Sequence, residues 1–188
     1  MAERDAAPPA AGGGGGTGFG GLLLLFLVMQ GATFILDLLA LRTVPASFAP
    51  GTWSLGALSS MYRPLVVAEA AARVAVVLLP VAGFALTFRR SPRAPAVWVA
   101  YFAVCVAYGL LEVVGTRLVV SQLGAALRAR QESTAEIDRL ARDASLVGAR
   151  TIVYGVFWGA YWLTSERVDR TFRRPRDAGA AAALPPPR

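Results

Sequence analysis

The sequence has no histidine, no lysine and no asparagine, and only one cysteine, Cys105, among its 188 residues. Without histidine the chain cannot build a Ser-His-Asp triad, a histidine proton shuttle or an imidazole metal site. One cysteine cannot form an internal disulfide or a cysteine-rich metal centre. The sequence therefore predicts no catalytic residues, no cofactor and no metal site of these kinds, and leaves carboxylates, tyrosines and arginines for any chemistry.

What the chain has in excess is apolar material: 55% of its residues are hydrophobic, and its mean hydropathy is +0.51. The apolar residues fall in blocks of roughly 20, the length that crosses about 30 Å of hydrocarbon at 1.5 Å per residue. We therefore expect an all-α integral membrane protein, a four-helix bundle. The expected spans are residues 19–41, 64–88, 96–120 and 149–165.

Two terminal segments are expected to be disordered tails. Residues 1–18 are rich in Ala, Gly and Pro, and residues 173–188 in Arg, Ala and Pro. Such segments bury too little apolar surface to offset the entropy lost on ordering. This leaves residues 19–172 as one four-span membrane domain.

The only long polar stretch, residues 121–148, lies between the third and fourth expected spans. Ser133 and Glu136 have the spacing of a capping box, which marks the start of a helix. Apolar residues then recur at helical spacing, as Ile137, Leu140, Ala144 and Val147. We expect a short amphipathic helix here, on the membrane surface or against the bundle.

All 19 basic residues are arginines, and the formal net charge is +7. The arginines lie at the ends of apolar blocks, where they contact lipid headgroups, so we expect a lipid bilayer and no nucleic acid as partner. Four spans place both termini on the side of the Arg89–Arg93 turn. Because basic residues in short loops favour the cytoplasm, we expect a multi-pass inner-membrane protein with both termini cytoplasmic and anionic headgroups at that face.

A specific string of residues closes the fourth span, and two glycines, Gly20 and Gly21, open the first. The closing string consists of Trp158, Tyr161, Ser165, Arg167, Val168, Thr171 and Phe172. Together these residues resemble the ends of a family of small four-span bacterial membrane proteins, domain of unknown function 2569. Leu22 and Ala160 stand where that family often has Trp and Pro. The resemblance covers roughly residues 19–173 and implies the four-span architecture, but no activity.

The closing string has two interpretations. As a membrane anchor, it places Trp158 and Tyr161 near the inner interface, with Arg167 and Arg170 on anionic headgroups and Phe172 in the apolar boundary. As a docking site, it binds a cytoplasmic partner.

Charged residues inside the spans are the most informative feature, because a charge at the bilayer centre costs roughly 2.5–3.5 kcal/mol and needs a partner or water. The expected topology places three carboxylates and three guanidiniums in the outer halves of the spans: Asp37, Glu69, Arg73, Glu112, Arg117 and Arg150. Glu69 and Arg73 lie four residues apart and share a helix face. Glu112 and Arg117 lie five residues apart and do not pair well within one helix, so we expect each to pair with a residue on another helix. We expect Asp37 to lie nearest Arg73 or Arg117.

This polar cluster has three interpretations: a structural network between helices, an outward-facing vestibule that binds a polar group or lipid headgroup, and a catalytic site. Gly155 and Gly159 form a GxxxG string typical of close helix packing. The absence of a catalytic constellation favours a non-enzymatic structural or accessory subunit of a membrane complex, with a membrane protein as partner. The alternative is a binding or transport component that uses the outer cluster.

Overall fold

The computed structural model describes residues 21–131 and 133–172, and all regular structure within them is helical. Both predicted tails, 1–18 and 173–188, lie outside the described residues. The elements are α1 (Leu22–Ala40), η1 (Leu41–Thr43), α2 (Val44–Ser47), α3 (Pro50–Trp53), η2 (Ser54–Ala57), α4 (Tyr62–Phe88), α5 (Ala94–Leu110), η3 (Leu111–Gly115), α6 (Thr116–Ala129), α7 (Ala135–Thr164) and α8 (Glu166–Phe172). η1 and η2 are 3-10 helices, and η3 is a π-helical turn.

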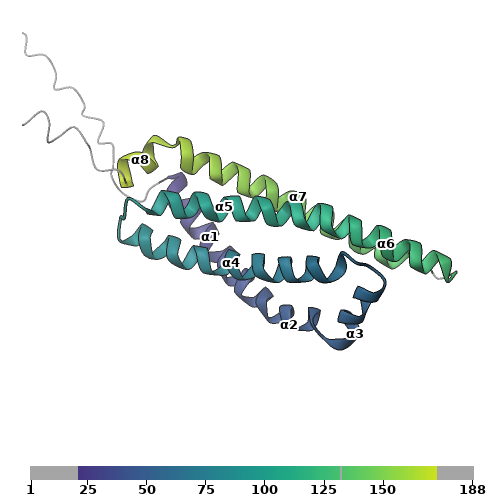
Figure 1. Cartoon of the computed structure of the whole chain (residues 1–188). Coiled ribbons are helices and arrows are strands. Elements are labelled where there is room, and N and C mark those ends of the chain that lie inside the picture. The colour runs from purple at the N-terminus through teal and green to yellow at the C-terminus, as the bar shows by residue number, and fades with distance from the viewer. Residues whose placement is uncertain (1–20, 132, 173–188) are drawn as a thin grey trace, which may run out of the picture.

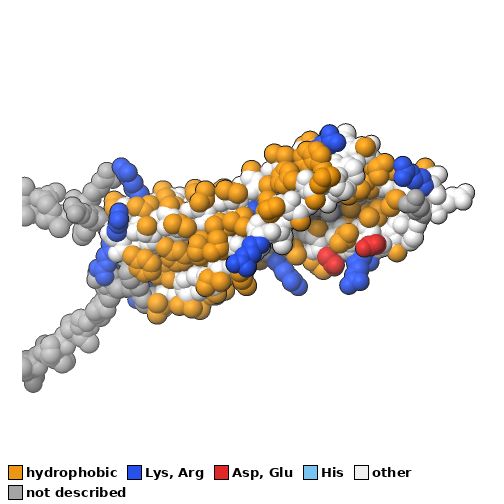
Figure 2. Space-filling model, turned by 90° about the horizontal axis from the view of Figure 1, so that it is seen from below, with side chains coloured by type: hydrophobic (Ala, Val, Ile, Leu, Met, Phe, Trp, Pro, Cys, Tyr) orange, Lys and Arg blue, Asp and Glu red, His pale blue; other side chains and the backbone are white. Residues whose placement is uncertain are grey.

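Within the described part of the chain, three helical stretches are long and apolar enough to cross a membrane: Leu22–Ser47, Tyr62–Phe88 and Ala94–Ala129. They contain the second and third expected spans and the first from residue 22 onward. The fourth expected span forms the second half of α7, behind a charged first half. On the face seen in Figure 2, hydrophobic side chains cover a broad band, with basic side chains gathered at the end beside the grey termini and again beyond the band.

The separate short helix expected at residues 121–148 is corrected by the structure. α5, η3 and α6 run on without a break, and α7 turns back beside them, so the polar stretch is shared between the end of α6 and the start of α7 (Figure 1). Thr134 caps α7 without a side-chain bond, while Ser133 Oγ accepts from the Ala135 N–H at 3.3 Å, so the predicted capping box does not form. The apolar residues from Ile137 to Val147 do lie on a helix, but they form the first half of the long helix α7 and not a separate element.

α5 and α7 pack most closely where each has a glycine. A Cβ built on Gly148 would lie 2.7 Å from the Gly109 carbonyl oxygen, and one built on Gly109 would lie 2.6 Å from the Gly148 oxygen. Gly155, seven residues after Gly148, lies at the next tight contact, where a built Cβ would lie 2.8 Å from Val106 Cγ2. Of the predicted pair, Gly155 therefore lies in a tight contact, whereas a Cβ on Gly159 would make only an ordinary 3.4 Å contact.

Large aromatic side chains hold α1 against the other helices. The buried Phe26 ring lies 4.9 Å from Trp98, 5.0 Å from Trp158 and 5.4 Å from Trp162, measured between ring centroids. The Trp98 indole N–H donates to Thr87 Oγ1 at 2.8 Å, which ties α5 to α4. Aromatic rings rather than glycines separate α1 from α5 and α7, and α1 runs obliquely across them (Figure 1).

We predict that Gly148→Ala destabilises the fold, because its methyl group meets the Gly109 backbone and the helices must separate. The expected loss is about 1–3 kcal/mol, the usual cost of overpacking. Thermal unfolding of the purified protein in detergent, followed by circular dichroism, measures it. Gly31→Ala is the control, because a Cβ at Gly31 meets nothing within 4 Å and should leave the melting temperature unchanged or higher. Equal melting temperatures for the two variants would contradict the close approach.

Candidate functional site

A buried amide joins three helices at the first polar layer. Gln30 on α1 is 0% exposed. Its Nε2 donates to the Tyr101 hydroxyl on α5 at 3.0 Å, and the Tyr154 hydroxyl on α7 donates to its Oε1. Both ends of the amide are therefore satisfied inside the protein, as a buried polar group requires. The aromatic core packs on one side of this layer.

A second polar layer joins α4 to α5. The Tyr108 hydroxyl accepts from Arg73 Nε at 3.2 Å and donates to Glu112 Oε1 at 2.5 Å. Arg73 Nη2 lies 3.9 Å from the same carboxylate oxygen, and Arg73 Nη1 donates to Thr43 Oγ1 at 3.4 Å, just after α1. Glu112 sits in the π-helical turn η3, a distortion that is frequent at functional sites. This layer therefore links α4 to α5 and to the segment after α1.

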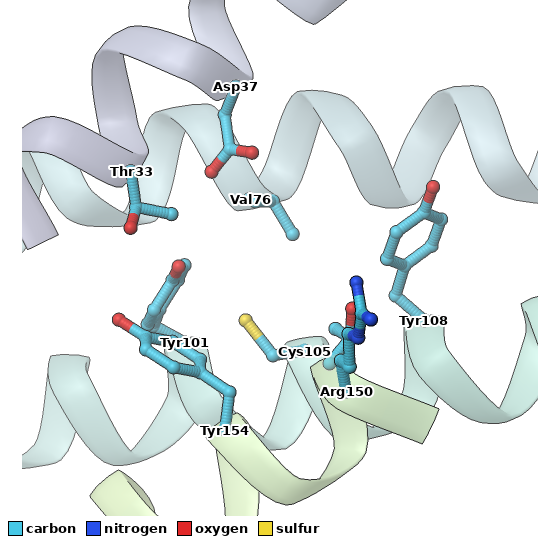
Figure 3. A pocket seen from close by; sticks show the side chains of 9 residues that line it. Thr33, Asp37, Val76, Tyr101, Cys105, Tyr108, Arg150 and Tyr154 are labelled. Carbon is cyan, nitrogen blue, oxygen red and sulfur yellow. The ribbon is translucent and has the colours of Figure 1, made fainter. Parts of the chain in front are cut away.

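A cavity of about 240 Å³ opens beside these two layers, where α1 diverges from α5 and α7. It is lined by Thr33, Asp37, Val76, Tyr101, Cys105, Tyr108, Arg150, Thr151 and Tyr154. Figure 3 shows Asp37 on one side of the space and Cys105, Tyr154 and Arg150 on the other. Tyr101 and Tyr154 belong to the first layer and Tyr108 to the second, so the two networks fix the cavity walls.

The charges that face this cavity are not paired within the described chain. Asp37 Oδ2 is buried and has no hydrogen-bond partner. Arg73 acts on Asp37 electrostatically, but no described guanidinium lies within 4.0 Å of its carboxylate. Arg150, which projects from α7, likewise has no ion pair among the described residues. A carboxylate and a guanidinium thus face one space without satisfying each other.

The structure gathers most of the six predicted cluster residues but not all of them. Glu69 interacts electrostatically with both Arg73 and Glu112, although no ion pair between described residues includes it. Glu112 pairs across helices as predicted, with Arg73 of α4, whereas no ion pair among the described residues includes Arg117. Arg117 instead lines a separate groove between α6 and α7, with Arg142 and Ser145 among its neighbours. Arg117 therefore faces the first half of α7 rather than the pair that Arg73 forms with Glu112.

Part of the C-terminal string packs into the core, and its interpretation as an anchor at the membrane interface stays a prediction. Trp158, Val168 and Phe172 are at most 4% exposed, and the Phe172 ring lies 5.7 Å from Trp162. Tyr161 packs edge-on against Trp158 at 5.6 Å. After Ser165, whose extended backbone ends α7, helix α8 folds back with Val168, Thr171 and Phe172.

Gly21 and Arg167, which belong to the two terminal motifs of the family resemblance, also lie close together. Gly21 adopts φ +59°, and a Cβ there would lie 2.7 Å from Arg167 Nη1. A side chain at this position would be strained and would displace the guanidinium. Gly20 lies outside the described residues. Arg170 forms an exposed ion pair with Glu166 at 2.8 Å.

Sequence reasoning missed the uncharged members of the site, namely Gln30, Thr33, Tyr101, Tyr108 and Tyr154. Gln30 gave a usable signal, because an amide in an otherwise apolar run needs a buried partner. The tyrosines gave none, because tyrosine in a span is also typical of a membrane interface.

No family model, curated protein or solved structure matches this chain. The resemblance to domain of unknown function 2569 therefore stays a prediction.

We predict that Gln30→Leu lowers stability by about 1–3 kcal/mol, because it leaves buried tyrosine hydroxyls without their partner. Thermal unfolding in detergent measures the loss. The triple variant Gln30→Leu/Tyr101→Phe/Tyr154→Phe removes the whole network and should recover more than half of it, since removing all partners leaves nothing unsatisfied. A triple variant no more stable than Gln30→Leu would refute this explanation.

Proposed function

We propose that this chain is a multi-pass, non-enzymatic protein of the inner membrane that binds a polar group in the cavity between Asp37 and Arg150. In this proposal α1, α4, α5 and the second half of α7 cross the bilayer as a four-helix bundle. Large apolar side chains on these helices are well exposed, including Leu36 at 66%, Leu78 at 61% and Val153 at 69%. Such surfaces are unfavourable in water and match a lipid environment. The resemblance to a four-span family supports the same architecture.

The orientation follows from the arginines. The α4–α5 turn carries Arg89, Arg90 and Arg93, and α8 carries Arg167 and Arg170 at the same end of the molecule (Figure 1). We place this end and both termini in the cytoplasm, where anionic headgroups attract basic residues. The α6–α7 hairpin, Asp37 and Arg150 then lie toward the outer side.

The observation that carries the binding proposal is the Asp37 carboxylate, which has a buried and unpartnered oxygen aimed into a cavity. If the Asp37 carboxylate served only to hold helices together, we would expect it to have a partner, as Glu112 has in Arg73. The tyrosine hydroxyls around the cavity already bond to Gln30, Arg73 and Glu112. The aromatic core packs next to Gln30 and closes the cavity on that side. A cavity closed at one end favours binding of a ligand over its passage through the protein.

A second candidate function is an accessory subunit of a membrane complex. The observation that favours it is the α6–α7 hairpin, which projects past α4 in Figure 1. The hairpin exposes Leu140 at 58%, Leu146 at 58% and Val147 at 52%. A membrane-protein partner would cover these apolar side chains.

We predict that a green fluorescent protein fused after the last residue fluoresces, because the C-terminus is cytoplasmic. Alkaline phosphatase inserted in the turn between Ala129 and Ala135 should be active, because that turn faces outward. Whole-cell fluorescence and phosphatase activity in a bacterial host check both. Phosphatase activity at the C-terminus and none at the turn would invert the proposed topology.

We predict that the protein purified from its own membrane in mild detergent carries a bound small molecule or lipid, seen as an added mass by native mass spectrometry. Thr33→Trp, which fills the cavity, should remove that mass while the protein stays folded and monodisperse. Gly31→Ala, two residues away and facing open space, should keep it. A stoichiometric protein partner with no added mass would favour the accessory subunit, and bare, monodisperse protein would exclude both functions.

A further inference from the structure

A shallow apolar groove on the surface of α7 adjoins the polar cavity. It has a volume of about 480 Å³ and is lined by Leu146, Ala149, Arg150, Val153, Tyr154, Phe157 and Trp158, all on α7. Arg150 and Tyr154 line both the cavity and the groove. A single molecule can therefore contact the charged cavity with one end and the apolar face of α7 with the other.

The charges of the cavity define the polar end of that molecule. A guanidinium binds phosphate with paired, charge-assisted hydrogen bonds, and a carboxylate binds a primary ammonium. Arg150 and Asp37 offer one of each, from opposite sides of the same space (Figure 3). A group with a phosphate and an amine neutralises both, whereas a group with only one charge leaves the other unpaired.

The direction of the groove matches a membrane lipid. From Arg150 to Trp158 α7 advances by eight residues, or about 12 Å at 1.5 Å per residue, toward α8. In the proposed topology this runs from the outer side toward the middle of the bilayer. A lipid of the outer leaflet has its headgroup and chains in this order.

We propose that the cavity and the groove together bind one phospholipid with an amine headgroup, of the phosphatidylethanolamine class. Arg150 binds the phosphate, Asp37 binds the amine, and one acyl chain lies along Val153 and Phe157. This inference rests on the proposed binding function and adds the class of ligand and the role of the groove.

The test uses the full chain, freed of native lipid in detergent and titrated with three probes under native mass spectrometry. The probes are phosphatidylethanolamine, phosphatidylglycerol, which lacks the amine, and glycerophosphoethanolamine, which lacks the chains. We expect one bound phosphatidylethanolamine per protein, with an affinity about tenfold above that for phosphatidylglycerol, the ratio that one charge-assisted hydrogen bond gives. Glycerophosphoethanolamine should bind more weakly than the lipid.

Variants assign each contact. Asp37→Asn should bring the preference for phosphatidylethanolamine over phosphatidylglycerol close to one, a ratio that does not depend on the protein's stability. Arg150→Gln should weaken both lipids by about tenfold or more. If Arg150→Gln does not fold, Arg150→Lys, which keeps the charge but loses the paired geometry, should still weaken both. Val153→Trp should weaken the lipids but not glycerophosphoethanolamine, whereas Val156→Trp, at an exposed position of α7 outside the groove, should change nothing.

The outcomes separate this inference from the function on which it rests. Equal binding of the two lipids, or a preference that survives Asp37→Asn, would overturn the assignment of the amine. Tight binding of glycerophosphoethanolamine, unaffected by Val153→Trp and equal to that of the lipid, would overturn the role of the groove while the cavity remains a binding site. Failure of all three probes, with a different mass still lost in Thr33→Trp, would reject the phospholipid but keep the proposed function. If no added mass responds to Thr33→Trp either, both are wrong.

Discussion

The close approach of α5 and α7 at Gly109 and Gly148 is the contact on which the rest of the structure depends. With no side chain on either side, the two backbones come near enough for each glycine to face the other's carbonyl oxygen. This contact aligns Tyr101, Cys105 and Tyr108 on α5 with Arg150 and Tyr154 on α7. α1 has no such contact, because Phe26 separates it from both helices by the width of aromatic rings. The cavity lies where a tight helix pair meets a loosely spaced third helix.

The polar groups around the cavity divide into those that the protein satisfies and those that it leaves unsatisfied. Gln30, Tyr101, Tyr108, Tyr154, Arg73 and Glu112 all have partners on another helix or one turn away. These contacts restrict the side chains and give the cavity a fixed shape, a requirement for selective binding. Below Gln30 the space is filled by aromatic rings. The protein therefore combines a rigid polar wall with an apolar floor, an arrangement suited to holding a ligand rather than passing it through.

The sequence predicted the long helices well because their apolar runs are continuous and their ends carry arginine and proline. It also predicted that charged residues within the apolar helices would gather, and Glu112 does pair across helices, with Arg73. It failed where a local signal had two meanings. The polar pattern of residues 121–148 fits a surface helix as well as it fits the ends of two long helices, and only the unbroken path through η3 decides between them. Gly109 and Gly148 gave no recognisable spacing, because their contact joins residues on different helices.

The contrast between Arg73 and Arg150 bears most directly on function. In the proposed topology both arginines lie in the outer part of the helices. An uncompensated charge costs roughly 2.5–3.5 kcal/mol at the bilayer centre and less toward its surface. For Arg73 the fold supplies a phenol, a hydroxyl and a carboxylate. For Arg150 the described chain supplies no such set, although Asp37 faces the same cavity. A fold that needed both charges only for stability would gain by bringing them together, as it does at Glu112. Their separation across a cavity, next to an apolar groove, is the arrangement expected when the missing partner is a zwitterion that comes from the membrane.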